Sequence, residues 1–288
     1  VGSYTPWGAP LNNLTVKGNA FINADINTVG NQNYRGPVYI GDPFMVQGNF
    51  DRYPDYPPSF FWTNSNNYDN RGVNLSSYGG GNITFRSTVD DVMAYYVRQG
   101  ASPDLNEWSS NSSWGLGVSA WNVTFREAVG LDTALLWSDI HADNKIRIRE
   151  GLTSYGDQTY SAPTISLGYD SSLYSLNAGK IDLAFDQLRT HGNNDISSPG
   201  GALKIQTYSA NGTIGVGDTA SCDGTCTITL STDLLNFGAS GIYGNNGAFS
   251  SVTLGGYLQS SGAIYLTESV DTELSRLTFV APNISLTD

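Results

Sequence analysis

The chain is poor in charge, since Asp, Glu, Lys and Arg make up only 14% of its 288 residues. Globular proteins carry roughly 25%. The shortage is greatest for basic residues: 14 Lys and Arg stand against 26 Asp and Glu, giving a net charge of -12 and a pI near 4.4. A chain with this balance repels nucleic-acid backbones and anionic membranes. We therefore expect no nucleic-acid partner.

Histidine is scarcer still, because His141 and His191 are the only two, and this limits imidazole catalysis. Asp139, His141 and Asp143 would share one face of a strand, where a metal could bind, although a solvated polar face is the preferred interpretation. No Gly-x-Ser-x-Gly elbow, Walker loop or His-Glu-x-x-His motif occurs. We predict that the protein is not an enzyme and has no catalytic residue, metal site or cofactor. Calcium in Asp-rich turns such as Asp223-Gly224 is a weak alternative.

Cysteine is limited to Cys222 and Cys226, which enclose a short turn-forming insert. A zinc site would need two further good ligands nearby, and the surrounding sequence offers none. The composition resembles that of extracellular proteins, in which disulfides persist. The two cysteines are therefore a candidate disulfide.

No stretch approaches 18 consecutive apolar residues, so we expect no membrane insertion. The sequence begins at Val1 without Met, and we favour removal of a leader over excision of a fragment. With 39% hydrophobic and 12% aromatic residues, the chain can bury enough apolar surface to fold.

Apolar and polar residues alternate along most of the chain, which is the pattern of half-buried β-strands. Residues 14 to 26 place Leu, Val, Ala and Ile on one face, and clusters of Gly, Asn, Asp and Ser separate this segment from similar ones. Helical periodicity is scarce, and only residues 88–98 and 132–137 could form a turn or two. The sequence therefore predicts an all-β protein.

Two internal repeats stand out against this alternation. Residues 30–41 (GNQNYRGPVYIG) parallel residues 156–168 (GDQTYSAPTISLG) in turn, aromatic and strand. Residues 82–90 (NITFRSTVD) parallel residues 122–130 (NVTFREAVG) at a spacing of 40 residues. A repeated coil of this kind cannot bury its apolar face alone and becomes stable by stacking on its neighbours.

These repeats resemble the degenerate repeats of bacterial surface proteins of the filamentous-haemagglutinin type, in which Gly-Asp/Asn-Gln-x-Tyr leads into an apolar strand. The resemblance touches residues 14–48, 79–90, 119–136 and 151–190, and the Asn-Pro-Asn-Leu secretion signature of such proteins is absent. It implies a right-handed parallel β-helix, or β-solenoid, that is secreted and rod-like. It also implies a role in adhesion, biofilm or cell-surface assembly.

We expect residues 1–190 to form the repeat-bearing solenoid, with inserted loops at 51–78 and 91–118, and residues 191–288 to continue the β-rich region or form a second domain. The alternative fold is one or two β-sandwich domains that exchange a strand between subunits. In either fold, exposed strand edges favour self-association into fibres. The candidate self-assembly residues are Leu14, Val16, Ile22, Ile26, Leu277 and Phe279.

The predicted function is that of an extracellular or cell-surface structural protein, either an adhesin segment or a self-assembling filament subunit. The alternative is a glycan-binding module, because aromatic planes stack on sugar rings. A polysaccharide-cleaving enzyme is a lesser alternative, since acidic residues are scattered. The candidate glycan contacts are Tyr53, Tyr56, Phe61, Trp62, Trp108 and Trp114.

Seven Asn-x-Ser/Thr sequons are candidate N-glycosylation sites, a number only slightly above chance for so Asn-rich a chain. They are Asn13, Asn74, Asn82, Asn111, Asn122, Asn211 and Asn283.

Overall fold

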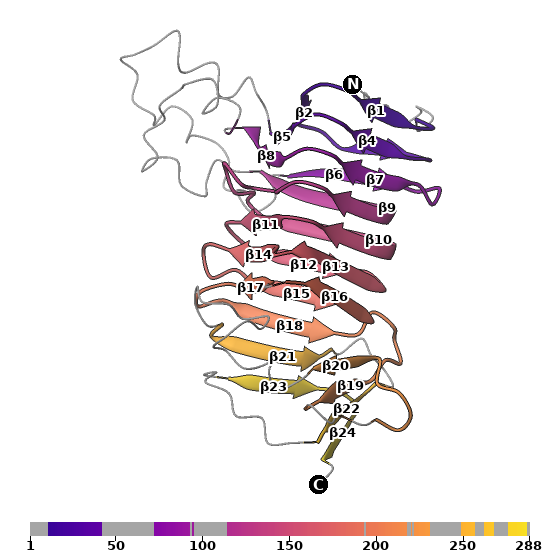
Figure 1. Cartoon of the computed structure of the whole chain (residues 1–288), viewed down its shortest axis with the longest axis vertical. Helices are drawn as coiled ribbons and strands as arrows, with labels where there is room; N and C mark the ends of the chain where they lie inside the picture. Colours follow the sequence, from indigo (N-terminus) through magenta and orange to yellow (C-terminus); the bar gives the residue numbers. More distant parts are fainter. Residues whose placement is uncertain are drawn as a thin grey trace, which may run out of the picture.

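The computed structural model describes residues 11–41, 72–92, 94, 114–192, 194–217, 220, 222–230, 249–256, 262–267 and 276–286. In these residues the strands stack one coil above the next along a rod, with the first coils at one end and the last at the other (Figure 1). None of these residues belongs to a helix that is long and apolar enough to cross a membrane.

Twenty-four strands in the described residues form four parallel sheets. The largest sheet contains β1 (Leu14–Val16), β3 (Ile26–Thr28), β4 (Gln32–Tyr34), β6 (Gly72–Ser77), β7 (Asn82–Phe85), β9 (Gly115–Phe125), β10 (Ser138–Ile148), β12 (Gln158–Ser161), β13 (Thr164–Tyr169), β15 (Ile181–Ala184), β16 (Gln187–His191), β18 (Ala202–Gln206), β21 (Ser251–Gly255) and β23 (Leu277–Val280). Two three-stranded sheets contain β2 (Ala20–Ile22), β5 (Val38–Ile40) and β8 (Val89–Asp91), and β11 (Gly151–Ser154), β14 (Ser172–Ser175) and β17 (Asp195–Ser197). The last sheet contains β19 (Ile214–Val216), β20 (Ile228–Leu230), β22 (Ala263–Leu266) and β24 (Asn283–Leu286).

Each strand pairs in parallel with the strand at the same place in the next coil, which makes the chain a parallel β-helix, as the sequence predicts. The repeat pair at a spacing of 40 residues is one such step, because Asn82 pairs with Asn122 and Phe85 with Phe125. Pairing runs from β15 through β18 and β21 to β23, so the main sheet crosses residue 190 without a break. Parallel stacking of this kind excludes the β-sandwich alternative, whose sheets are antiparallel.

The interior of the rod is a column of stacked apolar side chains, because alternate residues of each strand point inward. The rings of Tyr34, Phe85 and Phe125 come from three successive coils and stack nearly parallel, with centroids 5.1 and 4.9 Å apart. All three side chains are buried. Ile148 continues this column in the next coil. Like residues therefore contact like residues along the axis.

A buried glutamine explains the Gly-x-Gln-x-Tyr repeat. In the first copy, the Tyr34 hydroxyl donates to Oε1 of Gln32 at 2.9 Å, and the Gln32 amide donates to the carbonyl oxygen of Ser76 in the next coil at 2.9 Å. The same amide also lies 3.3 Å from the Thr28 hydroxyl. The motif thus satisfies polar groups that the tight turn would otherwise bury without partners.

The second copy repeats these bonds. The Tyr160 hydroxyl donates to Gln158 Oε1 at 3.0 Å, and the Gln158 amide donates to the Tyr174 carbonyl at 2.8 Å and to the Ser154 hydroxyl at 3.0 Å. Both glutamines are almost completely buried. Sequence similarity between the two segments therefore reflects one structural device used twice.

The expected loop bounds and helices were wrong in part. Residues 72–77, the end of the first expected inserted loop, form β6, and residues 115–118 of the second form the start of β9. Within the first expected helix, residues 89–91 form β8, which pairs with β5, whereas Val92 and Ala94 are helical as expected. Residues 132–137 form no helix, and Leu135 bridges to Ser154 in the next coil.

The buried glutamine of the repeat gives a direct test of how the coils hold together. Replacing Gln158 with Ala should lower the free energy of unfolding by about 3 kcal/mol, because it leaves a cavity and removes the partners of the Tyr160 hydroxyl and the Tyr174 carbonyl. Chemical denaturation followed by circular dichroism measures this. The exposed Gln187→Ala serves as control and should change stability by less than about 0.5 kcal/mol. Equal effects of the two substitutions would contradict the assigned role of Gln158.

Candidate ligand-binding faces

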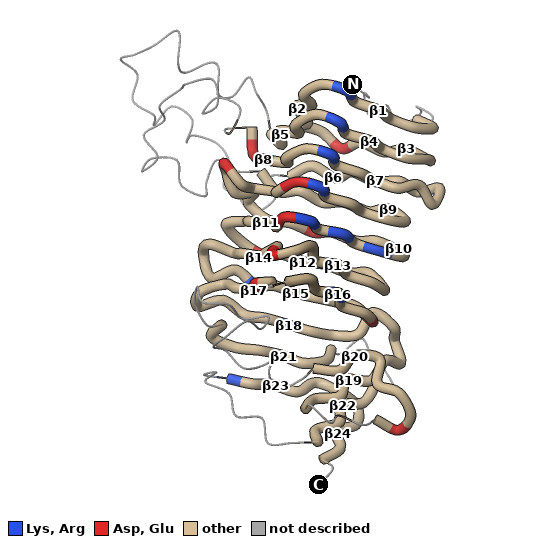
Figure 2. The backbone as a smooth tube through the Cα atoms, viewed as in Figure 1, with Lys and Arg blue, Asp and Glu red and all other residues tan. Residues whose placement is uncertain are grey.

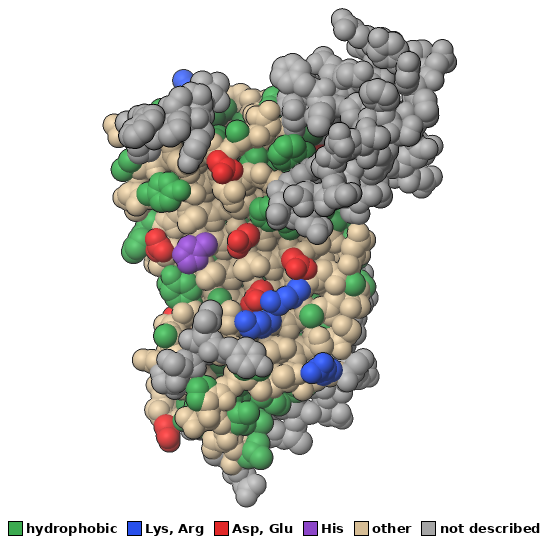
Figure 3. Space-filling view, turned by 180° about the vertical axis from the view of Figure 1, so that it is seen from behind, with side chains coloured by type: hydrophobic (Ala, Val, Ile, Leu, Met, Phe, Trp, Pro, Cys, Tyr) green, Lys and Arg blue, Asp and Glu red, His purple; other side chains and the backbone are tan. Residues whose placement is uncertain are grey.

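The main sheet bends at a corner and so gives the rod two long faces. The back face carries β6, the first half of β9, the first half of β10, β12, β15 and β18, and Figure 3 views the rod from this side. The front face carries β4, β7, the second halves of β9 and β10, β13 and β16. Residues at the bend therefore recur in successive coils, and we name this line the corner.

Aromatic side chains gather along the corner. Tyr78, directly after β6, is 73% exposed, and Trp121, at the bend of β9, is 45% exposed. Tyr208, two residues after the end of β18, is half-buried at the same corner, and its ring centroid is 6.3 Å from that of His141. Figure 3 shows hydrophobic side chains and a histidine close together along one long edge of this face. A row of rings that are at least partly exposed is a platform for stacking.

A small hollow of about 100 Å³ lies on the back face beside the corner. At about 30 Å³ per water molecule, it holds roughly three waters or a small polar group. Gly117 opens this space, since a Cβ atom there would overlap the Asn74 amide. The polar residues lining the hollow are Asn74, Ser76, Ser119, Asp139 and His141.

The electrostatics of the corner are acidic. Asp143 Oδ1 lies 3.3 Å from His141 Nε2, and Asp186 accepts a hydrogen bond from the Ser209 backbone N–H at 2.8 Å. Burial raises the pKa of the Tyr208 phenol, and the charges of Asp143 and Asp186 raise it further. Partial burial raises the pKa of Asp139, an effect that His141 opposes. The described residues include no group of three or more His, Cys, Asp or Glu suited to hold a metal ion.

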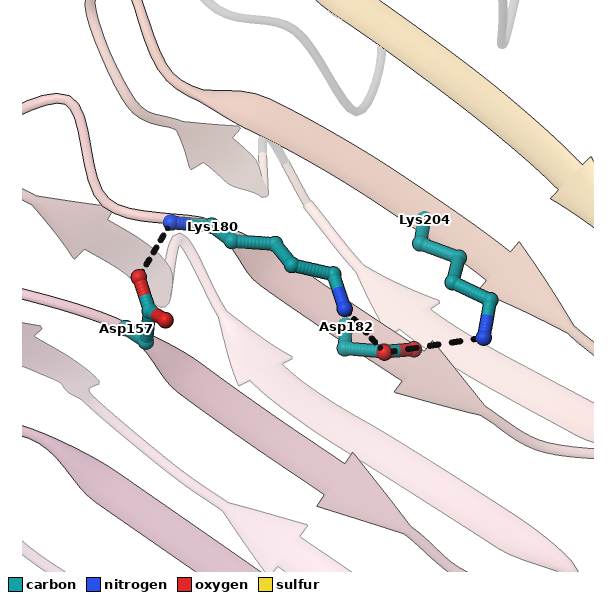
Figure 4. Close-up of polar contacts among 4 residues, drawn as sticks. All are labelled: Asp157, Lys180, Asp182 and Lys204. Atoms are coloured by element: carbon teal, nitrogen blue, oxygen red, sulfur yellow. Dashed lines mark hydrogen bonds and ion pairs between the residues drawn. The ribbon is translucent and has the colours of Figure 1, made fainter. Parts of the chain in front are cut away.

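The two lysines lower on the back face are neutralised by their neighbours. Lys180 Nζ lies 2.7 Å from Asp182 Oδ2, and Lys204 Nζ lies 3.8 Å from the same oxygen (Figure 4). The backbone N–H of Lys180 donates to Asp157 at 2.8 Å. These cations therefore leave the back face without a net positive patch.

An asparagine ladder runs along the front face through five successive coils. Asn144 donates its amide to Asn122 at 2.8 Å, Asn122 donates to Asn82 at 2.6 Å, and Asn82 donates to Asn31 at 3.1 Å. The backbone N–H of Asn31 donates to Asn13 at 2.8 Å. The candidate sequons at Asn82 and Asn122 thus use the nitrogen to which a glycan would be attached, and glycosylation there would break the ladder.

Most of the glycan-contact candidates fall outside the described residues, namely Tyr53, Tyr56, Phe61, Trp62 and Trp108, as does the sequon at Asn111. Trp114 is half-buried and packs against the core, and its backbone N–H donates to the buried Asp91 at 2.8 Å. Among the other sequons, the Asn74 amide lies 3.3 Å from Asp25, while Asn211 and Asn283 are exposed. Cys222 and Cys226 are joined in a disulfide that closes the turn between β19 and β20.

The candidate self-assembly residues lie in the first and last described coils. Leu14, Val16 and Ile26 are half-buried at one end, while Ile22 is buried. Leu277 and Phe279 are half-buried at the other end, where β23 pairs only with β21 among the described strands.

Sequence reasoning missed Tyr78, Trp121 and Tyr208 as members of one site. Trp121 directly precedes the repeat that begins at Asn122, so the repeat could have placed it at a coil boundary. Tyr208 lies about 87 residues further along the chain, and no sequence signal brings it to the same corner.

Comparison with protein-family models, curated proteins and solved structures finds no significant match.

Proposed function

We propose that the chain is an extracellular adhesive rod that binds glycans along its corner. The observation that carries this proposal is the row formed by the exposed rings of Tyr78 and Trp121 and the half-buried ring of Tyr208, beside a hollow lined with hydroxyl, amide and carboxyl groups. Sugar rings stack on such aromatic planes, and the polar groups match their hydroxyls.

The stacked coil makes this arrangement suited to a polymer. Neighbouring coils are separated by about 4.8 Å, so side chains at the corner repeat along the axis. Several weak contacts along one chain multiply through effective concentration and give useful avidity without a deep pocket. Adhesion therefore fits the shallow, extended geometry of the corner.

Binding without catalysis remains the favoured role. The adjacent acidic pair, Asp90 and Asp91, is buried, and its oxygens accept hydrogen bonds from the backbone N–H groups of Asp132 and Trp114. Asp182 is held by Lys180 and Lys204. These carboxylates hold the backbone or neutralise lysines and do not face one another across the hollow.

The corner platform is tested by single substitutions. Trp121→Ala should weaken binding to a neutral polysaccharide by about fivefold, because a stacking contact contributes about 1 kcal/mol. Affinity electrophoresis in gels that contain soluble glucan, mannan or xylan measures this. The control is Tyr169→Ala, which removes a ring that is 76% exposed away from the corner. The proposal fails if none of the three polysaccharides retards the native protein, or if both variants behave alike.

End-to-end assembly is a second candidate function. In the last described coil, Leu286 of β24 is 77% exposed and Ile284 is 49% exposed, and β24 pairs only with β22 among the described strands. A second copy stacked there would continue the parallel ladders and cover these side chains. Such a head-to-tail contact generates filaments.

Negative-stain electron microscopy tests this assembly. The native protein should form filaments, and Ile284→Asp with Leu286→Asp should leave single rods, because buried carboxylates oppose stacking. Leu131→Asp, on a side chain that is 66% exposed elsewhere, is the control and should leave the filaments unchanged. Single rods of native protein at every concentration would refute assembly.

A further inference from the structure

Five basic side chains occupy the same place in the first five described coils, despite the net negative charge of the chain. They are Lys17, Arg35, Arg86, Arg126 and Arg149, and we name them the basic column. Figure 2 shows these blue positions recurring in neighbouring coils beside β1, β4, β7, β9 and β10. The column therefore lies on the side of the rod seen in Figure 1, opposite the back face that Figure 3 shows.

Backbone hydrogen bonds fix the register of the column. The N–H of Arg35 donates to the carbonyl of Val16 at 2.8 Å, and the N–H of Arg86 donates to that of Tyr34 at 2.9 Å. The N–H groups of Arg126 and Arg149 continue the pattern, donating to Phe85 and Phe125 at 3.0 and 3.1 Å. Each cation is thus one coil step from the next, and the column spans about 19 Å at about 4.8 Å per step.

The cations of the column lack the acidic partners that neutralise the back-face lysines. None of the ion pairs among the described residues includes a member of the column. Four of the five side chains are exposed, and the half-buried Arg126 has a buried Nε without a hydrogen-bond partner. Like charges on neighbouring strands destabilise a sheet. A bound polyanion would offset that cost.

We propose that the basic column binds a carboxylated polysaccharide laid along the rod axis. Four of the five cations are arginines, whose planar forks match carboxylates with paired hydrogen bonds. The outward residue two positions before each of the first four cations is Thr15, Asn33, Thr84 or Thr124, and these hydroxyl and amide groups suit sugar hydroxyls. This site is separate from the corner, so it extends the proposed function with a second ligand class.

Nucleic acid is a poorer fit to the column. Proteins that bind single strands place aromatic rings beside their cations, so that bases stack on them. The outward residues two positions before these cations are Thr, Asn or, at position 147, Arg, and the rings of Tyr34, Phe85 and Phe125 that directly precede three of the cations are buried. A single file of cations also suits one flexible chain better than a duplex, whose second strand would meet a protein of net charge -12.

Two glutamates lie beside the lower part of the column and oppose an anionic ligand. Glu127 and Glu150 directly follow Arg126 and Arg149. Burial and the nearby Glu127 raise the pKa of Glu150, as expected for two carboxyl groups in contact. Neutral replacements at these two positions should therefore strengthen the site, whereas replacement of the arginines should weaken it.

The test is titration of alginate oligosaccharides into the purified protein at several salt concentrations. Arg35→Ser with Arg86→Ser should weaken binding about tenfold at low salt and reduce the slope of log K against log salt by about 2, one for each cation removed. Glu127→Gln with Glu150→Gln should tighten binding. The matched control is Lys180→Ser with Lys204→Ser, which makes the same change in net charge on the back face and should leave affinity within about twofold.

Three outcomes would overturn the proposal: no binding of alginate by the native protein at low salt, equal weakening by the control pair, or tighter binding of single-stranded DNA of equal charge. Neutral dextran of the same length should not bind at the column. It should therefore bind the native protein and the Arg35→Ser, Arg86→Ser double variant alike, and this binding reports only on the corner. Loss of the alginate interaction with retention of neutral-glycan binding would separate failure of this site from failure of the proposed function.

Discussion

Each described coil of the rod is held to its neighbours by parallel backbone hydrogen bonds in a fixed register, and the remaining features depend on this constraint. Because strands repeat at about 4.8 Å, a residue type that recurs at one place in the coil becomes a continuous column. Inside, this gives the stack of Tyr34, Phe85 and Phe125. Outside, it gives the asparagine ladder and the basic column.

The fold could be predicted because the internal repeats report the register. Asn82 and Asn122 were matched by sequence, and they are paired neighbours in the sheet. The Gly-x-Gln-x-Tyr motif was informative for a different reason: its glutamine is buried and bonds to the following coil, so few other residues can replace it. Helix was mispredicted at residues 89–91 and 132–137, because pairing along a sheet outweighs short helical patterns.

The candidate sites could not be predicted, since coil lengths are irregular. Along the path from Leu14 through Gln32, Ile83, Val123 and Ile146, the steps are 18, 51, 40 and 23 residues, from the differences in residue number. No fixed period links the five cations, although they lie in one line. The net charge is also misleading, because it averages over the acidic residues of the corner and the separate basic column.

The central claim is the register itself, and an engineered disulfide tests it most directly. Thr84 and Thr124 face outward on paired strands, at a separation of about 4.8 Å, within the range that a disulfide spans. Arg147 lies one step further, at about twice that distance from Thr84, which exceeds the range. Thr84→Cys with Thr124→Cys should oxidise to a bridge detectable by non-reducing peptide mapping, and Thr84→Cys with Arg147→Cys should not. A bridge in the second pair and none in the first would contradict the stacked-coil structure.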